Sequence, residues 1–205
     1  ASSAAALALA ASAIRRGEIS CALVVGADLL SEFVLSGFAA LLAVDPGGAR
    51  PFDADRRGMT VGSAATFALL MSRGRMAREG RRPLGVIGGW GLTCDANHLT
   101  GPSRDGAPLA AAAASAMRMA GCPADAVSAV AAHGTGTRYN DLMEMAALKR
   151  LFGDRPRPTF SVKGGIGHTL GAAGLAGALL ALEALRRGVV PPTVGLRRPA
   201  PEAEG

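Results

Sequence analysis

Short apolar runs alternate along the chain with longer stretches whose apolar residues follow helical spacing. The short runs, typical of buried strands, lie at 21–26, 60–72, 84–90, 127–132 and 159–162. The longer stretches predict helices over 1–16, 37–43, 108–120, 141–152 and 170–186. We expect the run at 21–26 to be covered on both faces. This alternation predicts an α/β fold with mainly parallel sheets layered against helices.

Polar and glycine-rich segments divide these elements. Ser2 and Ser3 are candidate N-caps of the first helix, and Gly17 is its expected stop. We expect a loop and turn over 27–36, a turn-rich segment over 45–58 and a basic connector over 76–82. A polar loop over 94–104 contains His98, which we expect to form hydrogen bonds within that loop, and a short extended segment over 189–194 follows the last helix.

Candidate chemistry gathers where two predicted strands end. His133 directly follows the run at 127–132, and Lys163 follows the run at 159–162. Ligands of parallel sheets bind beyond the carboxyl ends of the strands, so both side chains are expected on one edge. His168 lies in a glycine-rich loop just before the helix at 170–186, where backbone N–H groups favour negative charge.

Two neutral imidazoles can donate N–H bonds to one oxygen, which would stabilise an oxyanion or an enolate. The positive charge of Lys163 would keep the imidazoles neutral or orient one of them. Asp141 and Glu144 are three residues apart on one helical face, and Glu144 is the expected partner of Lys163. Two histidines without an acidic or thiolate ligand at short spacing do not predict a metal site.

Composition and charge narrow the function further. The 205 residues are 49% hydrophobic and 19% charged, so they predict a globular protein with a sizeable core. Aromatic residues make up only 4%, and the net charge of +6 contains no run of five like charges, so nucleic-acid binding is not expected. Cys21, Cys94 and Cys122 show no metal or redox spacing, which favours a reduced cytoplasmic protein. We see no signal peptide and no membrane span.

Four ordered motifs resemble those of the β-ketoacyl-acyl carrier protein synthases, especially synthase II and the ketosynthases of type II polyketide systems. H-G-T-G-T-R-Y-N-D-L-M-E occupies 133–144, and S-V-K-G-G-I-G-H-T-L-G-A-A-G occupies 161–174. R-P-F-D-A-D-R-R-G-M at 50–59 is similar to the family's R-P-F-D-x-x-R-D-G-F, and D-A-N-H-L-T at 95–100 to its D-A-x-H-x-T. The resemblance covers essentially the whole chain.

The resemblance implies a thiolase-like fold, layered α-β-α-β-α with two similar halves. We assign 1–83 to the end of the first half and 84–205 to most of the second. The resemblance also implies decarboxylative Claisen condensation between acyl and malonyl thioesters. His133 and His168 would then bind the malonyl thioester and stabilise the enolate, with Lys163 supporting them. By the same analogy the residues that contact substrate would be Thr135, Thr137, Thr100 and Phe38, with Asp141 and Glu144 as structural support.

The chain also departs from the family pattern. The family's nucleophilic cysteine precedes A-S-S, and this chain begins Ala1-Ser2-Ser3, so we expect that cysteine just before Ala1. The family's C-terminal G-F-G-G-x-N strand is likewise not in the sequence. Gly62-Ser63-Ala64-Ala65-Thr66 replaces G-E-G-A-G, and Arg138 replaces a proline, which indicates a divergent branch. We expect that the 205 residues do not fold alone.

Two functions remain open from the sequence: a condensing enzyme, or a non-catalytic subunit of the chain-length-factor type. His133, Lys163 and His168 favour the enzyme. Acyl carrier protein is the expected partner, and its phosphopantetheine would carry the substrates, so no separate cofactor is needed. A homodimer is expected, with a heterodimer as the alternative. Seven arginines are expected either to lie on the solvated surface or to form a docking face for the acidic carrier. They are Arg56, Arg57, Arg73, Arg75, Arg78, Arg81 and Arg82.

Overall fold

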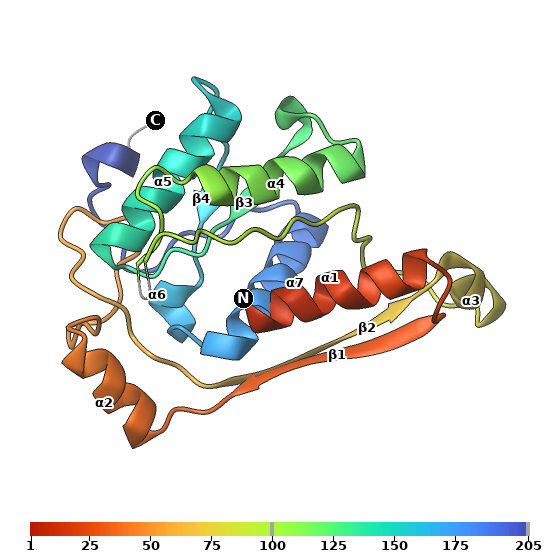
Figure 1. Ribbon diagram of the computed structural model, residues 1–205, viewed down its shortest axis with the longest axis horizontal. Coiled ribbons are helices and arrows are strands. Elements are labelled where there is room, and N and C mark those ends of the chain that lie inside the picture. Colours follow the sequence, from red (N-terminus) through yellow and green to blue (C-terminus); the bar gives the residue numbers. More distant parts are fainter. Residues whose placement is uncertain (99–100, 204–205) are drawn as a thin grey trace.

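A computed structural model describes residues 1–98 and 101–203 (Figure 1). Its helices are α1 (Ser2–Arg15), α2 (Glu32–Ala40), α3 (Arg73–Arg78), α4 (Ala107–Ala120), α5 (Arg138–Phe152), α6 (Lys163–Ile166) and α7 (Ala173–Arg187). Its strands are β1 (Cys21–Asp28), β2 (Ala64–Met71), β3 (Val130–Ala131) and β4 (Thr159–Phe160). Single 3₁₀ turns cover Ala124–Ala126, Leu170–Ala172 and Pro201–Ala203.

Helices α1 and α7 pack against each other at one face of the β1–β2 pair (Figure 1). They approach closely because the residues at their crossing are small: a Cβ added to Gly174 would lie 2.8 Å from the Cβ of Ala4. Ser3 is 2% exposed, and its Oγ accepts the N–H of Leu175 at 3.0 Å. Ser3 was therefore wrongly predicted as a helix cap. It lies inside α1 and joins two helices that are far apart in sequence.

The β1–β2 pair is antiparallel, with Leu23 opposite Leu69 and Val25 opposite Phe67. These four side chains form the outer face of the pair, and they are 53–68% exposed. The prediction that β1 is covered on both faces is therefore wrong for this chain. Helices α1 and α7 cover the inner face of the pair and leave the outer face exposed. The mainly parallel arrangement holds for β3–β4 but not for this longer pair.

Strands β3 and β4 are parallel, with Val130 opposite Thr159. His133 follows β3 by two residues and Lys163 follows β4 by three. Their parallel direction brings both residues to the same edge, as the sequence predicted. The glycine-rich segment after β4 does not remain a loop, because residues from Lys163 to Ile166 form the helical turn α6.

Two helices lie partly in segments that were not predicted as helix, and both begin at a serine cap. Ser31 Oγ accepts the N–H of Val34, so α2 starts inside the segment predicted as a loop. Ser72 Oγ accepts the N–H of Arg75, and α3 replaces the first part of the predicted connector. A short polar cap is a weaker sequence signal than an apolar period, which explains both errors.

Residues 84–90 were predicted as a strand, but the structure assigns them none. The segment instead passes close to helices. A Cβ on Gly89 would lie 2.1 Å from the Ala116 carbonyl oxygen in α4, and one on Gly85 would lie 2.5 Å from the Leu182 side chain in α7. Leu84 and Val86 are 64% and 76% exposed, so the expected burial is also absent. The glycines here allow close approach of the backbone to helices.

The two proposed halves contact each other, since α7 packs on both β1 and β2. The division after residue 83 stays a prediction. Among the described residues, no helix combines the length and the apolar character needed to cross a bilayer.

Candidate active site

The turn that follows β3 carries His133 and is held by a carboxylate of α5. Glu144 is 5% exposed, and its two oxygens accept the N–H of His133 at 2.5 Å and of Gly134 at 2.7 Å. Gly134 has a φ of 39°, a left-handed conformation that favours glycine. A Cβ there would lie 2.6 Å from the Ser161 Cβ, so the turn also needs glycine for space.

A second buried carboxylate holds the rest of this turn. Asp141 is 1% exposed, and its Oδ1 accepts the N–H of Thr135 at 3.0 Å and of Gly136 at 3.2 Å. Its Oδ2 accepts the N–H of Phe52 at 2.9 Å. Asp141 and Glu144 therefore lie on one face of α5, as the spacing predicted, and together fix the backbone around His133.

His168 is fixed by its own backbone and by its ring. Its carbonyl accepts the N–H of Gly62 at 3.0 Å, and its N–H donates to the carbonyl of Thr60 at 2.6 Å. Its Nδ1 accepts the N–H of Leu170 at 3.0 Å. The neutral ring therefore carries its proton on Nε2 and presents that N–H as a donor. Leu170 has a φ of 44°, which is strained for a residue with a side chain.

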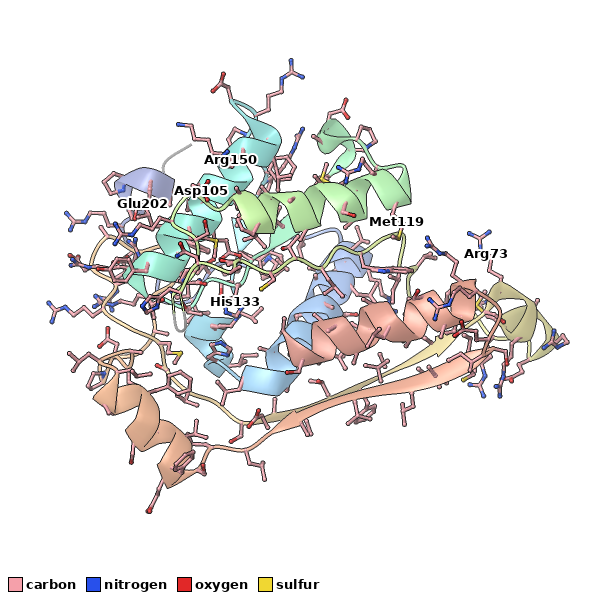
Figure 2. All side chains as sticks on the ribbon, viewed as in Figure 1. Arg73, Asp105, Met119, His133, Arg150 and Glu202 are labelled. Atoms are coloured by element: carbon pink, nitrogen blue, oxygen red, sulfur yellow. The ribbon has the colours of Figure 1, made fainter. Side chains whose placement is uncertain are left out.

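The two imidazoles face each other directly. Their ring centroids are 5.0 Å apart, and the ring planes are inclined by 81°, an edge-to-face arrangement. His133 belongs to the turn after β3 and His168 to the segment before α7, so two different supports hold one pair. Figure 2 labels His133 beside α6, in the region where these elements meet.

Lys163 lies close to this pair and is 5% exposed. Its Nζ donates to the carbonyl oxygen of His133. Ser161 supports the same turn, because its Oγ donates to the Gly134 carbonyl at 2.7 Å. The predicted Lys163–Glu144 ion pair is not formed among the described residues. Glu144 instead binds backbone N–H groups and acts on Lys163 only through its charge.

The site keeps both imidazoles neutral. Burial first, and the nearby Lys163 charge second, lower the pKa of His133 to about 3. Burial and Lys163 lower the pKa of His168 to about 4. Burial also lowers the pKa of Lys163, although the negative charges of Glu144 and Asp141 act to raise it. At neutral pH, both rings can therefore donate an N–H without gaining a proton.

The predicted substrate contacts are spread around this pair. Thr135 is buried, and its Oγ1 lies 2.8 Å from Oγ1 of Thr137, which precedes α5. Phe38 is half-buried on α2, and no aromatic ring contact among the described residues joins it to the imidazoles. Thr100 lies outside the described residues. A Cβ on Gly101 would lie 3.7 Å from the His98 ring, which places His98 beside the next part of its loop.

Arg56 differs from the other arginines grouped with it. It is 5% exposed and binds Asp53, Asp141 and Glu202, so neither a solvated surface nor a docking face describes it. Arg57 is exposed. Figure 2 shows Arg73, on α3, well separated from His133.

The cysteines do not supply a nucleophile to this pair. Cys21 begins β1, whereas Asp28 at the other end accepts the N–H of Gly171 near His168. Eight residues of strand separate these ends by about 24 Å. Cys94 is exposed, and Cys122 follows α4. The part of the chain that the structure describes contains no cluster of three or more His, Cys, Asp or Glu side chains suited to a metal.

Residues 1–75 match the model of the β-ketoacyl synthase N-terminal domain, and residues 84–197 match that of its C-terminal domain. The chain belongs to the β-ketoacyl synthase family. It is 38% identical to nodulation protein E of Rhizobium leguminosarum bv. trifolii, over 97% of this chain and 50% of that protein. It thus spans about half the length of this relative.

Solved ketosynthase structures share the fold. The ishigamide ketosynthase/chain length factor superposes with a TM-score of 0.94 at 35% identity, over 99% of this chain and 50% of that one. A type II polyketide ketosynthase in AntDE:AntF, in complex with its acyl-carrier protein, superposes with a TM-score of 0.91 at 25% identity. The match covers 98% of this chain and 52% of that one. The chain therefore has the thiolase-like α/β fold of the β-ketoacyl synthases.

Several residues that build the site were not assigned this role from the sequence. Ser161, Leu170 and Arg56 all hold the two histidine segments in place. Each lies within a motif that carried the family resemblance, which was a usable signal. Their partners are distant in sequence or depend on backbone conformation, so spacing alone did not assign them a role.

Proposed function

We propose that this chain carries the decarboxylating part of a β-ketoacyl-acyl carrier protein synthase, acting in fatty acid or polyketide biosynthesis in the cytoplasm. The observation that supports it most strongly is the edge-to-face pair of neutral imidazoles, 5.0 Å apart. In this proposal their N–H groups donate to the carbonyl oxygen of a malonyl thioester. That oxygen gains negative charge as the reaction proceeds, so these bonds strengthen toward the transition state.

In the first step, the bond between the malonyl α-carbon and its carboxylate breaks, and CO₂ leaves. The electron pair passes into the thioester and forms an enolate, whose oxygen is held by His133 and His168. In the second step, the enolate carbon attacks the carbonyl carbon of an acyl thioester on a cysteine. The carbon–sulfur bond breaks and the cysteine leaves as a thiolate. A cysteine for this step is not among the three described above.

The low pKa values of the imidazoles suit the first step. A cationic imidazole would donate a proton to the enolate and stop the carbon–carbon bond from forming. A neutral ring stabilises the enolate by hydrogen bonding and leaves its carbon nucleophilic. Lys163 favours the neutral form by its charge and holds the His133 backbone through its carbonyl.

The proposed substrates are thioesters on the phosphopantetheine of acyl carrier protein, and the two threonines beside His133 would contact that arm. One of the similar solved structures is a ketosynthase complexed with its acyl-carrier protein, which supports this partner. We propose a dimer, either of identical subunits or with a chain-length-factor partner. The ishigamide ketosynthase/chain length factor supports the second arrangement.

The alternative function, a non-catalytic subunit of the chain-length-factor type, is supported by the same similar structure. Such a subunit would not need two desolvated neutral imidazoles, whose burial has a free-energy cost. The site geometry therefore favours the enzyme.

The test is CO₂ release from radiolabelled malonyl-acyl carrier protein by the full-length protein that contains this sequence. His133→Ala and His168→Ala should each lower the rate about 10²- to 10³-fold, the usual cost of one lost oxyanion donor. Cys122→Ser is the control and should keep the wild-type rate. If the folded wild-type protein releases no CO₂, alone or with a candidate partner subunit, the catalytic proposal is wrong.

A further inference from the structure

Arg56 makes an internal connection that a surface arginine would not make. Its Nη1 donates to the Asp53 carbonyl at 2.9 Å, and its Nη2 donates to Oε1 of Glu202. Its Nε lies 3.5 Å from Oδ2 of Asp141, an ion pair without the geometry of a hydrogen bond. The guanidinium is therefore shared between the 50–58 segment, α5 and the short helix at Pro201–Ala203.

Asp141 is the connection from Arg56 to the catalytic turn. Its two oxygens accept the N–H groups of Phe52, Thr135 and Gly136. A carboxylate that loses its charge becomes a weaker acceptor for several N–H donors at once. The hydrogen bonds that fix the turn therefore depend on Asp141 remaining ionised, although it is 1% exposed.

The geometry points to Arg56 as a positioning residue that fixes, through Asp141, the turn carrying His133 and the two threonines. This inference rests on the proposed function for its catalytic consequence, but not for its structural part. Arg56 does not approach the imidazoles itself. Together with the N–H donors to Asp141, its charge favours the ionised carboxylate, where burial alone would favour the neutral acid.

Glu202 extends this connection to a distant part of the chain. It lies 146 residues from Arg56 in sequence, and the short helix that bears it packs against α5. Figure 2 shows Glu202 on that short helix. Glu202 orients the far side of the guanidinium, so the edge of Arg56 that bears Nε faces Asp141.

Other charged groups also face Asp141 and must be separated from Arg56 in any pH experiment. Glu144 lies on the same helix, and Lys163 approaches from α6. Burial raises the pKa of Asp141, against the N–H donors and the Arg56 charge. Burial raises the pKa of Glu144 as well. The acid limb is the fall in activity as pH decreases. It can be assigned to Asp141 only if a substitution at Arg56 changes the pH at which this fall occurs.

The test compares three variants of the full-length protein: Arg56→Met, Arg56→Lys and Arg57→Met. Arg57 is the matched control, since it is the exposed neighbour and no hydrogen bond or ion pair joins it to the described residues. Amide hydrogen exchange measures protection at Thr135 and Gly136, with Val24 in β1 as the internal reference. Rates of CO₂ release across a pH series give the acid limb.

We expect Arg56→Met to lower protection at Thr135 and Gly136 about tenfold while Val24 keeps its protection. Its acid limb should move to higher pH by up to about one unit, because the nearby cation is lost while the N–H donors to Asp141 remain. Arg56→Lys should restore both properties, since it keeps a positive charge near Asp141. Arg57→Met should keep the wild-type protection at Thr135 and Gly136 and the wild-type pH of the acid limb, since neither depends on how fast the carrier protein docks.

Equal loss of protection at all three amides in Arg56→Met would mean a general loss of stability and would overturn the inference. Equal behaviour of Arg56→Met and Arg56→Lys would overturn it too, because charge would not then be the cause. The exchange measurement needs no catalysis. A wild-type protein that releases no CO₂ would refute the proposed function, and the exchange data would still decide the role of Arg56.

Discussion

Replacing Glu144 with Ala should loosen the turn that carries His133. Each Glu144 oxygen accepts one buried backbone N–H, from His133 and from Gly134. Ala leaves both donors without an acceptor in a site where Glu144 itself is 5% exposed. The variant also removes a negative charge that supports the protonated form of Lys163, so the pKa of Lys163 should fall further below its usual value.

The size of the effect follows from these two bonds. A buried donor left unsatisfied costs about 1–3 kcal/mol, so two cost about 2–6 kcal/mol. Part of this is offset, because a buried carboxylate no longer has to be desolvated. The free energy of unfolding should therefore fall by about 2–4 kcal/mol.

The assay is denaturant unfolding of the full-length protein, with Glu32→Ala as the control. Glu32 is exposed in the first turn of α2, and its loss should change the unfolding free energy by less than about 1 kcal/mol. A Glu144→Ala protein that unfolds within about 1 kcal/mol of the wild type would refute this reasoning. It would show that water or another group satisfies the two donors.

The remaining predictions concern packing, pH and the open sheet face. Gly174→Ala would place a Cβ 2.8 Å from the Cβ of Ala4 and should destabilise the protein by about 1–3 kcal/mol. Gly177→Ala would add a Cβ with nothing within 4 Å and should stabilise the protein by about 0.5–1 kcal/mol. Denaturant unfolding of both variants checks these values. Since the pKa values of His133 and His168 are depressed from 6.5 to about 3 and about 4, their contribution to stability should be complete above pH 6.5 and decline as pH falls toward those values. Unfolding midpoints across that range test this, and a midpoint that does not change would contradict it. The outer face of β1–β2, 53–68% exposed, should make the 205-residue chain by itself associate or aggregate; size-exclusion chromatography showing a monomer with cooperative melting would count against this.

Much of the fold and the edge that bears the site could be predicted from local patterns. The apolar runs located most of β1 and all of β2, and those before His133 and Lys163 correctly placed both residues at strand ends. Local pattern failed at 84–90, where apolar and β-prone residues form no assigned strand. Strand formation requires a hydrogen-bonding neighbour, and that segment packs against helices instead.

The histidines, the lysine and the two acidic residues of the site were also identified from the sequence, but their partners were not. Glu144 was paired with Lys163 because opposite charges attract, yet it binds N–H groups ten and eleven residues away. The positive φ of Gly134 turns those N–H groups toward α5, and no charge pattern contains that information. Arg56 was assigned to the surface because most arginines lie there.

The sequence by itself determined which chemical groups are present, at which strand ends they lie, and to which family the motifs belong. The tertiary structure alone decided that the imidazoles meet at 5.0 Å, that Ser3 joins a helix 172 residues away, and that Arg56 is buried. The physical reason is the range of the interactions. Helical and strand periods depend on neighbours a few residues apart, whereas these contacts depend on how whole elements pack.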